Sequence, residues 1–189
     1  MTPPAIDRSF PCDWQAEILP ARPAILPARH FVYPQQVEEV ERGALEVLVW
    51  PESPAGAPFL ATCALGFRDP AVPTGIWSTP NPQELCAVSG GYAYIIDTAA
   101  PERFTMLSYR PVIQVHPAAD PGLLLFVSNR AILAWGKNGE TWQSTKLSDE
   151  GVTITTIQMR MLRGIGWNMM TDRETPFALD LQNGNLIKP

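Results

Sequence analysis

Histidine and cysteine are scarce in this sequence, whose 189 residues include two histidines and three cysteines. The cysteines, Cys12, Cys63 and Cys86, lie far apart, form no C-x-x-C pair and have no histidine beside them. A metal such as zinc needs three or four converging ligands, which this spacing does not supply. We therefore expect no metal and no cofactor. Two buried thiols are expected at Cys63 and Cys86 rather than a disulfide, because both lie in strand-like apolar runs.

Charge is also sparse, with charged residues at 17% and a net charge of −5. The 14 lysines and arginines form no basic stripe, which argues against nucleic acid and anionic membrane as main partners. No apolar run reaches the length of about 18 residues that a membrane span requires. The first residues, MTPPAIDRSFPCDW, lack the charged and apolar regions of a secretory signal. These features predict a cytoplasmic protein.

Catalytic and nucleotide-binding motifs are missing as well. The sequence has no G-x-S-x-G elbow, no phosphate-binding P-loop, no H-E-x-x-H and no EF-hand loop. The run Gly164 to Gly166 is a lone G-x-G in a strand-like segment, with no helix behind it to receive a phosphate. His30 and His116 are expected at the surface or as capping residues rather than as general bases. Together these absences favour a non-catalytic protein.

The positions of proline indicate where central strands can form. Most of the 20 prolines lie in residues 3–82, and none lies between Gly122 and Thr175. Proline cannot donate a hydrogen bond to a sheet, so a proline-free stretch suits central strands. Residues 1–30 are predicted to be a proline-rich extended arm, and residues 31–189 a single all-β domain. Trp14, Ile18 and Leu19 would dock the arm on that domain.

The stretch from Leu124 to Ile157 predicts four short strands in succession. Apolar runs alternate there with turn residues. Asn138 and Gly139 are a strong hairpin signal because both tolerate positive φ. With these two residues as the loop, Trp135 would lie opposite Trp142. A meander is expected.

A similar pattern occurs upstream, in residues 85–116, where Gly90 and Gly91 form the first predicted turn. Residues 124–157 follow the same plan, but the identities between the two stretches are few. Either a true internal repeat or a chance similarity of apolar strands explains the match.

The remaining segments also favour strands. Ala44 to Trp50 and Phe59 to Phe67 predict a hairpin, and Met159 to Trp167 and Pro176 to Leu181 predict two further strands. A short helix is expected only at Tyr33 to Arg42. The predicted fold class is therefore all-β, built from consecutive antiparallel hairpins and four-stranded meanders, either propeller-like or arranged as a two-sheet sandwich.

Two resemblances accompany this pattern. The run LDLQNG, Leu179 to Gly184, resembles the D-L-x-x-G turn of quinoprotein-type propeller blades, which implies a propeller-like closure or two packed sheets. A small group of uncharacterised bacterial all-β proteins of unknown function is similar to this chain in the runs YPQQVEEVERGALEVLV, GIWSTPNPQELCAVSGGYAYIIDT, LAWGKNGETWQSTKLS and GWNMMTDRE. The second resemblance implies a bacterial cytoplasmic origin and carries over no site.

The densest polar cluster lies around Trp167. In this cluster Asp172 and Glu174 could act as acid and base beside an aromatic ring and an arginine. The same residues could instead form a solvated connection between two strands, where Asp and Arg pair locally. The candidate binding residues of the cluster are Trp167, Asn168, Asp172, Arg173 and Glu174.

Three further aromatic residues are expected at the surface. Prolines surround Trp77, and the spacing of Tyr92 and Tyr94 places both on one face of a strand. Exposed aromatic residues on a surface of low charge typically mark contact sites. The strand tryptophans are expected in the core: Trp50, Trp135 and Trp142.

These observations predict a soluble, non-catalytic binding or protein-interaction module. Its expected partner is another protein or a second copy of the chain. The alternative is a small-ligand binding protein or a hydrolase-like enzyme that uses Trp167, Asp172 and Glu174.

Overall fold

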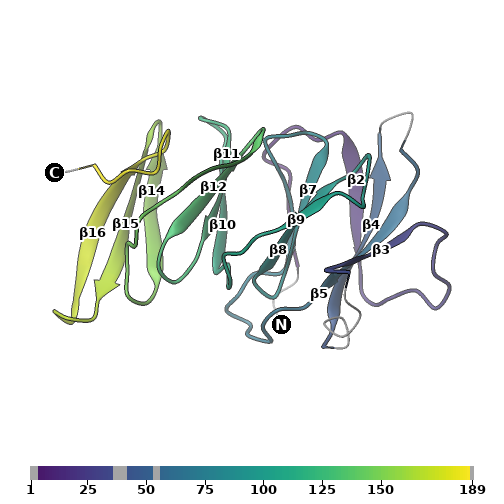
Figure 1. Ribbon diagram of the computed structural model, residues 1–189, viewed down its shortest axis with the longest axis horizontal. Helices are drawn as coiled ribbons and strands as arrows, with labels where there is room; N and C mark the ends of the chain where they lie inside the picture. The colour runs from purple at the N-terminus through teal and green to yellow at the C-terminus, as the bar shows by residue number, and fades with distance from the viewer. Residues whose placement is uncertain (1–3, 36–41, 53–55, 188–189) are drawn as a thin grey trace. The chain divides into compact units, whose positions relative to one another are not determined.

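The computed structural model describes residues 4–35, 42–52 and 56–187. Within these residues every regular element is a β-strand, and the sixteen strands form four sheets, none of which closes into a barrel (Figure 1). The all-β prediction is confirmed. The helix predicted from Tyr33 to Arg42 lies largely outside the described residues, and Tyr33 itself ends a strand.

The chain divides into two compact units, residues 1–111 and 112–189. Strands of the first unit are β1 (Ala5–Asp7), β2 (Trp14–Leu19), β3 (His30–Tyr33), β4 (Ala44–Pro51), β5 (Phe59–Ala64), β6 (Gly75–Ser78), β7 (Glu84–Ser89), β8 (Tyr92–Asp97) and β9 (Phe104–Met106). Strands of the second are β10 (Gln114–Ala118), β11 (Leu123–Val127), β12 (Ile132–Gly136), β13 (Gly139–Gln143), β14 (Val152–Gln158), β15 (Met161–Asn168) and β16 (Arg173–Asp180). The predicted boundary at residue 30 and the proposed internal repeat stay predictions.

The first unit contains two sheets, with strand orders β1-β6-β7-β8-β9 and β2-β4-β5-β3. Most neighbouring strands are antiparallel, and the predicted hairpin of β4 and β5 is confirmed. The pairs β1–β6 and β3–β5 are parallel instead. A parallel partner cannot come from a tight hairpin, so these two pairs join strands that are distant in the sequence.

Trp14 anchors the N-terminal residues to the first unit. Its side chain is 1% exposed, and its indole Nε1 donates a hydrogen bond to the Glu84 carbonyl at 3.1 Å. Ile18, on the same strand, packs partly against the core. The strand β2 that carries both residues pairs with β4. Trp14 is thus part of a sheet of the first unit, and the docking of a separate arm by Trp14, Ile18 and Leu19 stays a prediction.

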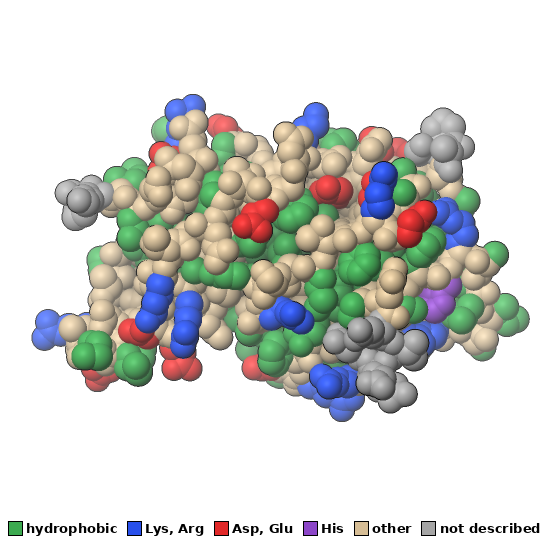
Figure 2. Space-filling model, in the orientation of Figure 1, with side chains coloured by type: hydrophobic (Ala, Val, Ile, Leu, Met, Phe, Trp, Pro, Cys, Tyr) green, Lys and Arg blue, Asp and Glu red, His purple; other side chains and the backbone are tan. Residues whose placement is uncertain are grey.

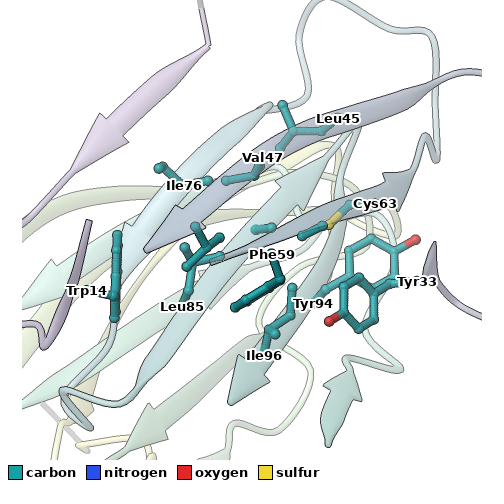
Figure 3. Packing of buried hydrophobic residues seen from close by; sticks show 13 residues of the cluster. Trp14, Tyr33, Leu45, Val47, Phe59, Cys63, Ile76, Leu85, Tyr94 and Ile96 are labelled. Atoms are coloured by element: carbon teal, nitrogen blue, oxygen red, sulfur yellow. The ribbon is translucent and has the colours of Figure 1, made fainter. Parts of the chain in front are cut away.

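The core of the first unit lies between its two sheets. Val47 and Phe59 contribute from one sheet, and Ile76 and Leu85 from the other (Figure 3). The cysteines are free thiols, and burial raises the pKa of Cys63 and Cys86. Two facing sheets around one apolar layer are the sandwich arrangement of the prediction.

The second unit also has two sheets, ordered β10-β11-β12-β13 and β14-β15-β16. Their shared core includes Leu125 and Ile132 from the first sheet and Leu162 and Leu179 from the second. Trp142 joins this core and donates from its indole Nε1 to the Leu181 carbonyl at 2.7 Å. A four-stranded meander is present, but it consists of β10 to β13. The predicted placement of the last strand, β14, in the same meander is wrong, because β14 pairs with β15 in the next sheet.

The hairpin of β12 and β13 differs from the predicted register. Gly136 pairs with Gly139, so the two-residue loop is Lys137 and Asn138, and Gly139 follows it at φ 107°. This turn places Trp135 opposite Glu140, and a β-bulge between Ala134 and Trp135 then places Trp142 opposite Ala134. The predicted Trp135–Trp142 pair is wrong because the loop begins one residue earlier than predicted, which changes the partner of Trp135. Of the three tryptophans expected in the core, Trp135 and Trp142 are buried, and Trp50 is exposed.

Two glycines allow the inner face of β15 to be closely covered. A Cβ at Gly166 would lie 2.1 Å from the Leu147 carbonyl oxygen, and one at Gly164 would lie 2.4 Å from the Phe177 ring. Phe177 is the cross-strand partner of Gly164, so its ring covers the backbone that glycine leaves bare. The lone G-x-G of the sequence is therefore a packing feature.

We expect Gly166→Ala to lower the free energy of unfolding by about 2 kcal/mol, because the added methyl group must displace backbone rather than a flexible side chain. Chemical denaturation measures the change. Thr155→Ala, on an exposed position of β14, is the control and should stay within about 0.5 kcal/mol of the wild type. Equal stability of the two variants would contradict the close packing at Gly166.

Candidate functional site

The structure buries two of the aromatic residues predicted to be exposed. Trp77 is 6% exposed because residues 75–78 form β6, which pairs with strands on both sides. Tyr94 is fully buried on β8, and its hydroxyl donates to the Ala64 carbonyl at 3.0 Å. The exposure predicted for Trp77 and Tyr94 is wrong, because both residues lie on interior strands of a five-stranded sheet and Tyr94 belongs to the core of the first unit.

Tyr92 is half-buried and already has contacts within its own unit. Its ring packs edge-on against Phe67 at 5.8 Å between centroids, and the Arg110 guanidinium lies 5.0 Å from its centroid. A Cβ at Gly66 would lie 2.3 Å from the ring, so the aromatic face rests on that backbone. Tyr92 and Tyr94 do share one side of β8, but that side faces the core.

The polar cluster forms the end of the β15–β16 hairpin. Asn168 pairs with Arg173, and Trp167 with Glu174, so the predicted connection is partly strand. The Asn168 side-chain oxygen accepts hydrogen bonds from the backbone N–H groups of residues 170 and 171. Asp172 closes the turn at φ 51°. Asn168 and Asp172 therefore shape the turn.

Asp149 holds this hairpin end to the preceding segment. Its carboxylate accepts a hydrogen bond from the Met169 N–H at 2.8 Å and forms an ion pair with Lys146. These contacts, the one with Lys146 first, lower the pKa of Asp149. Ser148 forms two hydrogen bonds with the backbone of Trp167. Its hydroxyl accepts one from the Trp167 N–H and donates one to the Trp167 carbonyl. The start of the turn is thus fixed by Ser148 and Asp149.

Trp167 and Glu174 lie on the side of the three-stranded sheet that turns away from the core. Leu162, Gly164 and Gly166 are buried, and the residues between them alternate to the opposite side. We call this side the outer face. On β15 and β16 it consists of Met161, Arg163, Ile165, Trp167, Glu174, Pro176, Ala178 and Asp180.

The positions of Asp172 and Glu174 do not suit acid–base catalysis. Two catalytic carboxyl groups must converge on one substrate. Glu174 is an exposed residue of the outer face, whereas Asp172 lies in the turn beyond the last strand pair. Within residues 4–35, 42–52 and 56–187, no group of three or more His, Cys, Asp or Glu side chains could hold a metal ion.

An open hollow of about 600 Å³ lies at the opposite end of the outer face. Its charged lining residues are Arg160, Arg163 and Asp180, and its apolar ones include Met159 and Met161. Sequence reasoning missed this hollow. It forms because the turn between β14 and β15 falls at Met159 and Arg160, two residues that the prediction had included in the strand.

Exposed methionines mark both ends of the outer face. Met159 is 83% exposed at the turn before β15, and Met169 and Met170 are 63% and 89% exposed at the turn after it. Methionine adapts its shape to irregular partners and is frequent at binding surfaces. Trp167 and Arg163 complete a set of residue types that protein interfaces favour.

A second polar arrangement, also missed, lies in the first unit. Glu46 is 5% exposed on β4, and its carboxylate accepts hydrogen bonds from the Arg22 Nε at 2.8 Å and from the Thr62 hydroxyl at 2.5 Å. The His30 Nε2 lies 2.8 Å from the same Thr62 oxygen. We call these four residues the Glu46 network.

The hydrogen-bond order of this network follows from the chemistry of its members. An ionised carboxylate only accepts, so the single hydroxyl hydrogen of Thr62 goes to Glu46. His30 must then donate through its Nε2–H. The Thr62 hydroxyl is fully buried and donates its hydrogen to Glu46, so it is not accessible to act as a nucleophile. The network instead holds the segment around Arg22 against the sheet.

The sequence did contain a signal for this network. Glu46 interrupts the apolar strand LEVLV, and Thr62 interrupts the apolar strand FLATCA. In the predicted hairpin of these two strands the residues are direct partners. Two polar residues that meet in the middle of an apolar hairpin indicate a buried bond, because neither can be left unpaired there.

No protein-family model, curated protein or solved structure matches this chain. Among the residues that the structure describes, no helix has the length and apolar character needed to cross a membrane. The function must therefore be inferred from the arrangement of the residues themselves.

We expect Thr62→Val to lower the free energy of unfolding by about 1–3 kcal/mol, because it removes a bond from a buried carboxylate and leaves His30 without its acceptor. Thr155→Val, at an exposed strand position, is the matched control. Thermal and chemical denaturation of both variants measure the difference. A Thr62→Val protein as stable as the control would show that the network contributes nothing to stability.

His30 predicts a pH dependence of stability. Burial, and then the positive charge of Arg22, lower its pKa below the usual 6.5. The unfolded chain therefore binds the proton more tightly, so the free energy of unfolding should fall as the pH drops below about 6.5. His116, whose pKa burial also lowers, acts in the same direction.

In His30→Asn the fall in unfolding free energy between pH 7 and pH 5.5 should be smaller than in the wild type, and smaller still when His116→Asn is added. Urea denaturation at each pH measures both. Identical pH profiles for wild type and His30→Asn would contradict the lowered pKa.

Proposed function

We propose that this chain is a non-catalytic protein-interaction module and that the outer face of β14, β15 and β16 is its contact surface for a partner protein. The observation that carries the proposal is the composition of that face. A tryptophan and an arginine lie on one side of a single sheet, and solvent-exposed methionines lie in the turns at the two ends of β15. These residue types are enriched in protein interfaces, and tryptophan and arginine are frequent binding hot spots.

The rigidity of the surface also supports this function. Trp167 lies on a strand whose neighbours on the inner face are packed against residues 147–148, and its own backbone is bonded to Ser148. A backbone that is already fixed loses less conformational entropy when a partner binds. The outer face is therefore suited to recognition without rearrangement.

The enzyme alternative has less support, because Asp172 and Glu174 do not share a face of the sheet. A cytoplasmic location is part of the proposal. Its support is the state of the cysteines, since Cys12, Cys63 and Cys86 are free thiols, and free thiols are typical of reducing compartments. On the face shown in Figure 2, basic and acidic side chains are interspersed, which agrees with a protein partner rather than a polyanion.

The test compares the purified chain with two variants in which apolar surface is removed. One is Trp167→Ala combined with Met169→Ser and Met170→Ser. The control is Ile25→Ser with Leu26→Ser, which removes exposed apolar side chains from the first unit. A protein captured from lysate of the chain's source by the wild type is identified, purified and titrated against all three by calorimetry.

We expect the outer-face variant to bind this protein at least about tenfold more weakly, a change of about 1.4 kcal/mol. The control should bind like the wild type. Equal binding by all three proteins, or a wild type that binds nothing, would refute the proposal. A second copy as the sole binder would refute the assignment of a different protein as partner.

A further inference from the structure

Two arginines in the hollow form no ion pair with any residue that the structure describes. Arg160 is in the turn between β14 and β15, and Arg163 is on the outer face of β15. Among the described residues, the Arg163 side chain has one polar contact, a 3.2 Å approach of its Nε to the Met161 sulfur, which is a weak acceptor. The other guanidinium donors of Arg163 and those of Arg160 have no acceptor among the described residues and are available to an anion.

Asp180, the acidic residue of the hollow, is already engaged elsewhere. One of its carboxylate oxygens accepts from the Gln182 N–H at 2.9 Å, and the other from the Asn183 side-chain amide at 3.4 Å. These bonds direct the carboxylate to the turn that follows β16. The hollow therefore has a net positive charge in a chain whose net charge is −5.

The rest of the lining is apolar or neutral. Met159, Met161 and Ile187 supply apolar surface, and Gln158 supplies an amide. A volume of about 600 Å³ holds several residues of an extended chain and is larger than a simple anion needs. Its lining combines bidentate donors for carboxylates with adaptable apolar contacts.

We propose that this hollow binds an acidic, partly apolar peptide segment of the partner protein. Carboxylates of that segment pair with Arg160 and Arg163, and an apolar side chain packs on Met159, Met161 and Ile187. This inference rests on the proposed function, since it names the chemistry that the outer face recognises. Charge complementarity selects the segment, because its acidic groups meet the unpaired guanidinium groups.

The probe is an array of immobilised eight-residue peptides of randomised sequence, each paired with a copy in which every Asp and Glu is replaced by Asn and Gln. The labelled full-length chain is applied as wild type, as Arg160→Gln/Arg163→Gln, and as the control Lys137→Gln/Arg130→Gln. The control removes two exposed positive charges from the same unit but outside the hollow. Circular dichroism confirms that all three proteins are folded.

We expect the wild type and the control to bind acidic peptides that also contain apolar residues, and to bind the amide copies at least about tenfold more weakly. The Arg160→Gln/Arg163→Gln variant should lose the preference for acidic peptides. Equal binding of the acidic and amide copies, equal loss in the control, or no bound peptide would overturn the inference. Arginine-dependent binding of inorganic phosphate or of an oligonucleotide in preference to the peptides would overturn it as well.

The failure of this inference can be told apart from failure of the proposed function. If Arg160→Gln/Arg163→Gln keeps the full affinity of the chain for its captured partner but the Trp167 variant does not, the outer face is the contact surface and the hollow is not part of it. If both variants keep full affinity, both statements are wrong.

Discussion

Residues 147–148 and Phe177 pack closely on the two glycines of β15. This packing is the constraint that determines which residues of β15 face the core and which face outward. It requires Gly164 and Gly166 to face the core, since any side chain there would collide with backbone or with an aromatic ring. A strand has a period of two, so the residues between and beside the glycines must face the other way. The position of Arg163, Ile165 and Trp167 together on the outer face is a consequence of that packing.

The strand pairing also explains why the polar residues around Trp167 fall into two groups. The strand pairing places Trp167 and Glu174 on the outer face, whereas Asn168 and Asp172 form the turn. The turn residues determine the backbone geometry of the turn, and the face residues belong to the partner surface that we propose. In the first unit, the buried Glu46 network has the corresponding structural role, because it fixes the segment around Arg22 to its sheet.

Much of the fold could be predicted from local sequence. Apolar runs bounded by turn residues located most strands, and the hairpin of β4 and β5 was predicted from their spacing alone. Register was less accessible, as the bulge at Ala134 and Trp135 shows, because one extra residue changes every pair beyond it. The parallel pairs β1–β6 and β3–β5 join distant strands, for which no local pattern exists.

The candidate site could be predicted only in part. The region around Trp167 was identified from its density of polar residues, but burial of Trp77 and Tyr94 depends on which strands cover them, and a single sequence does not contain that information. The hollow was missed because Arg160 and Arg163 are ordinary in the sequence. Their shared place in one hollow depends on the position of the turn at Met159 and Arg160. Their lack of an acidic partner depends on the hydrogen bond that Asp180 accepts from the turn after β16.

The most direct test of the central claim is site-specific photo-crosslinking. A photoreactive phenylalanine derivative replaces Ile165 on the outer face, or Glu140 on β13 as the reference position, and the full chain is irradiated in lysate of its source. We expect one protein to be crosslinked through position 165 and not through position 140, and the crosslink to map to an acidic segment of that protein. Crosslinking of the same proteins from both positions, or none from position 165, would contradict the central claim.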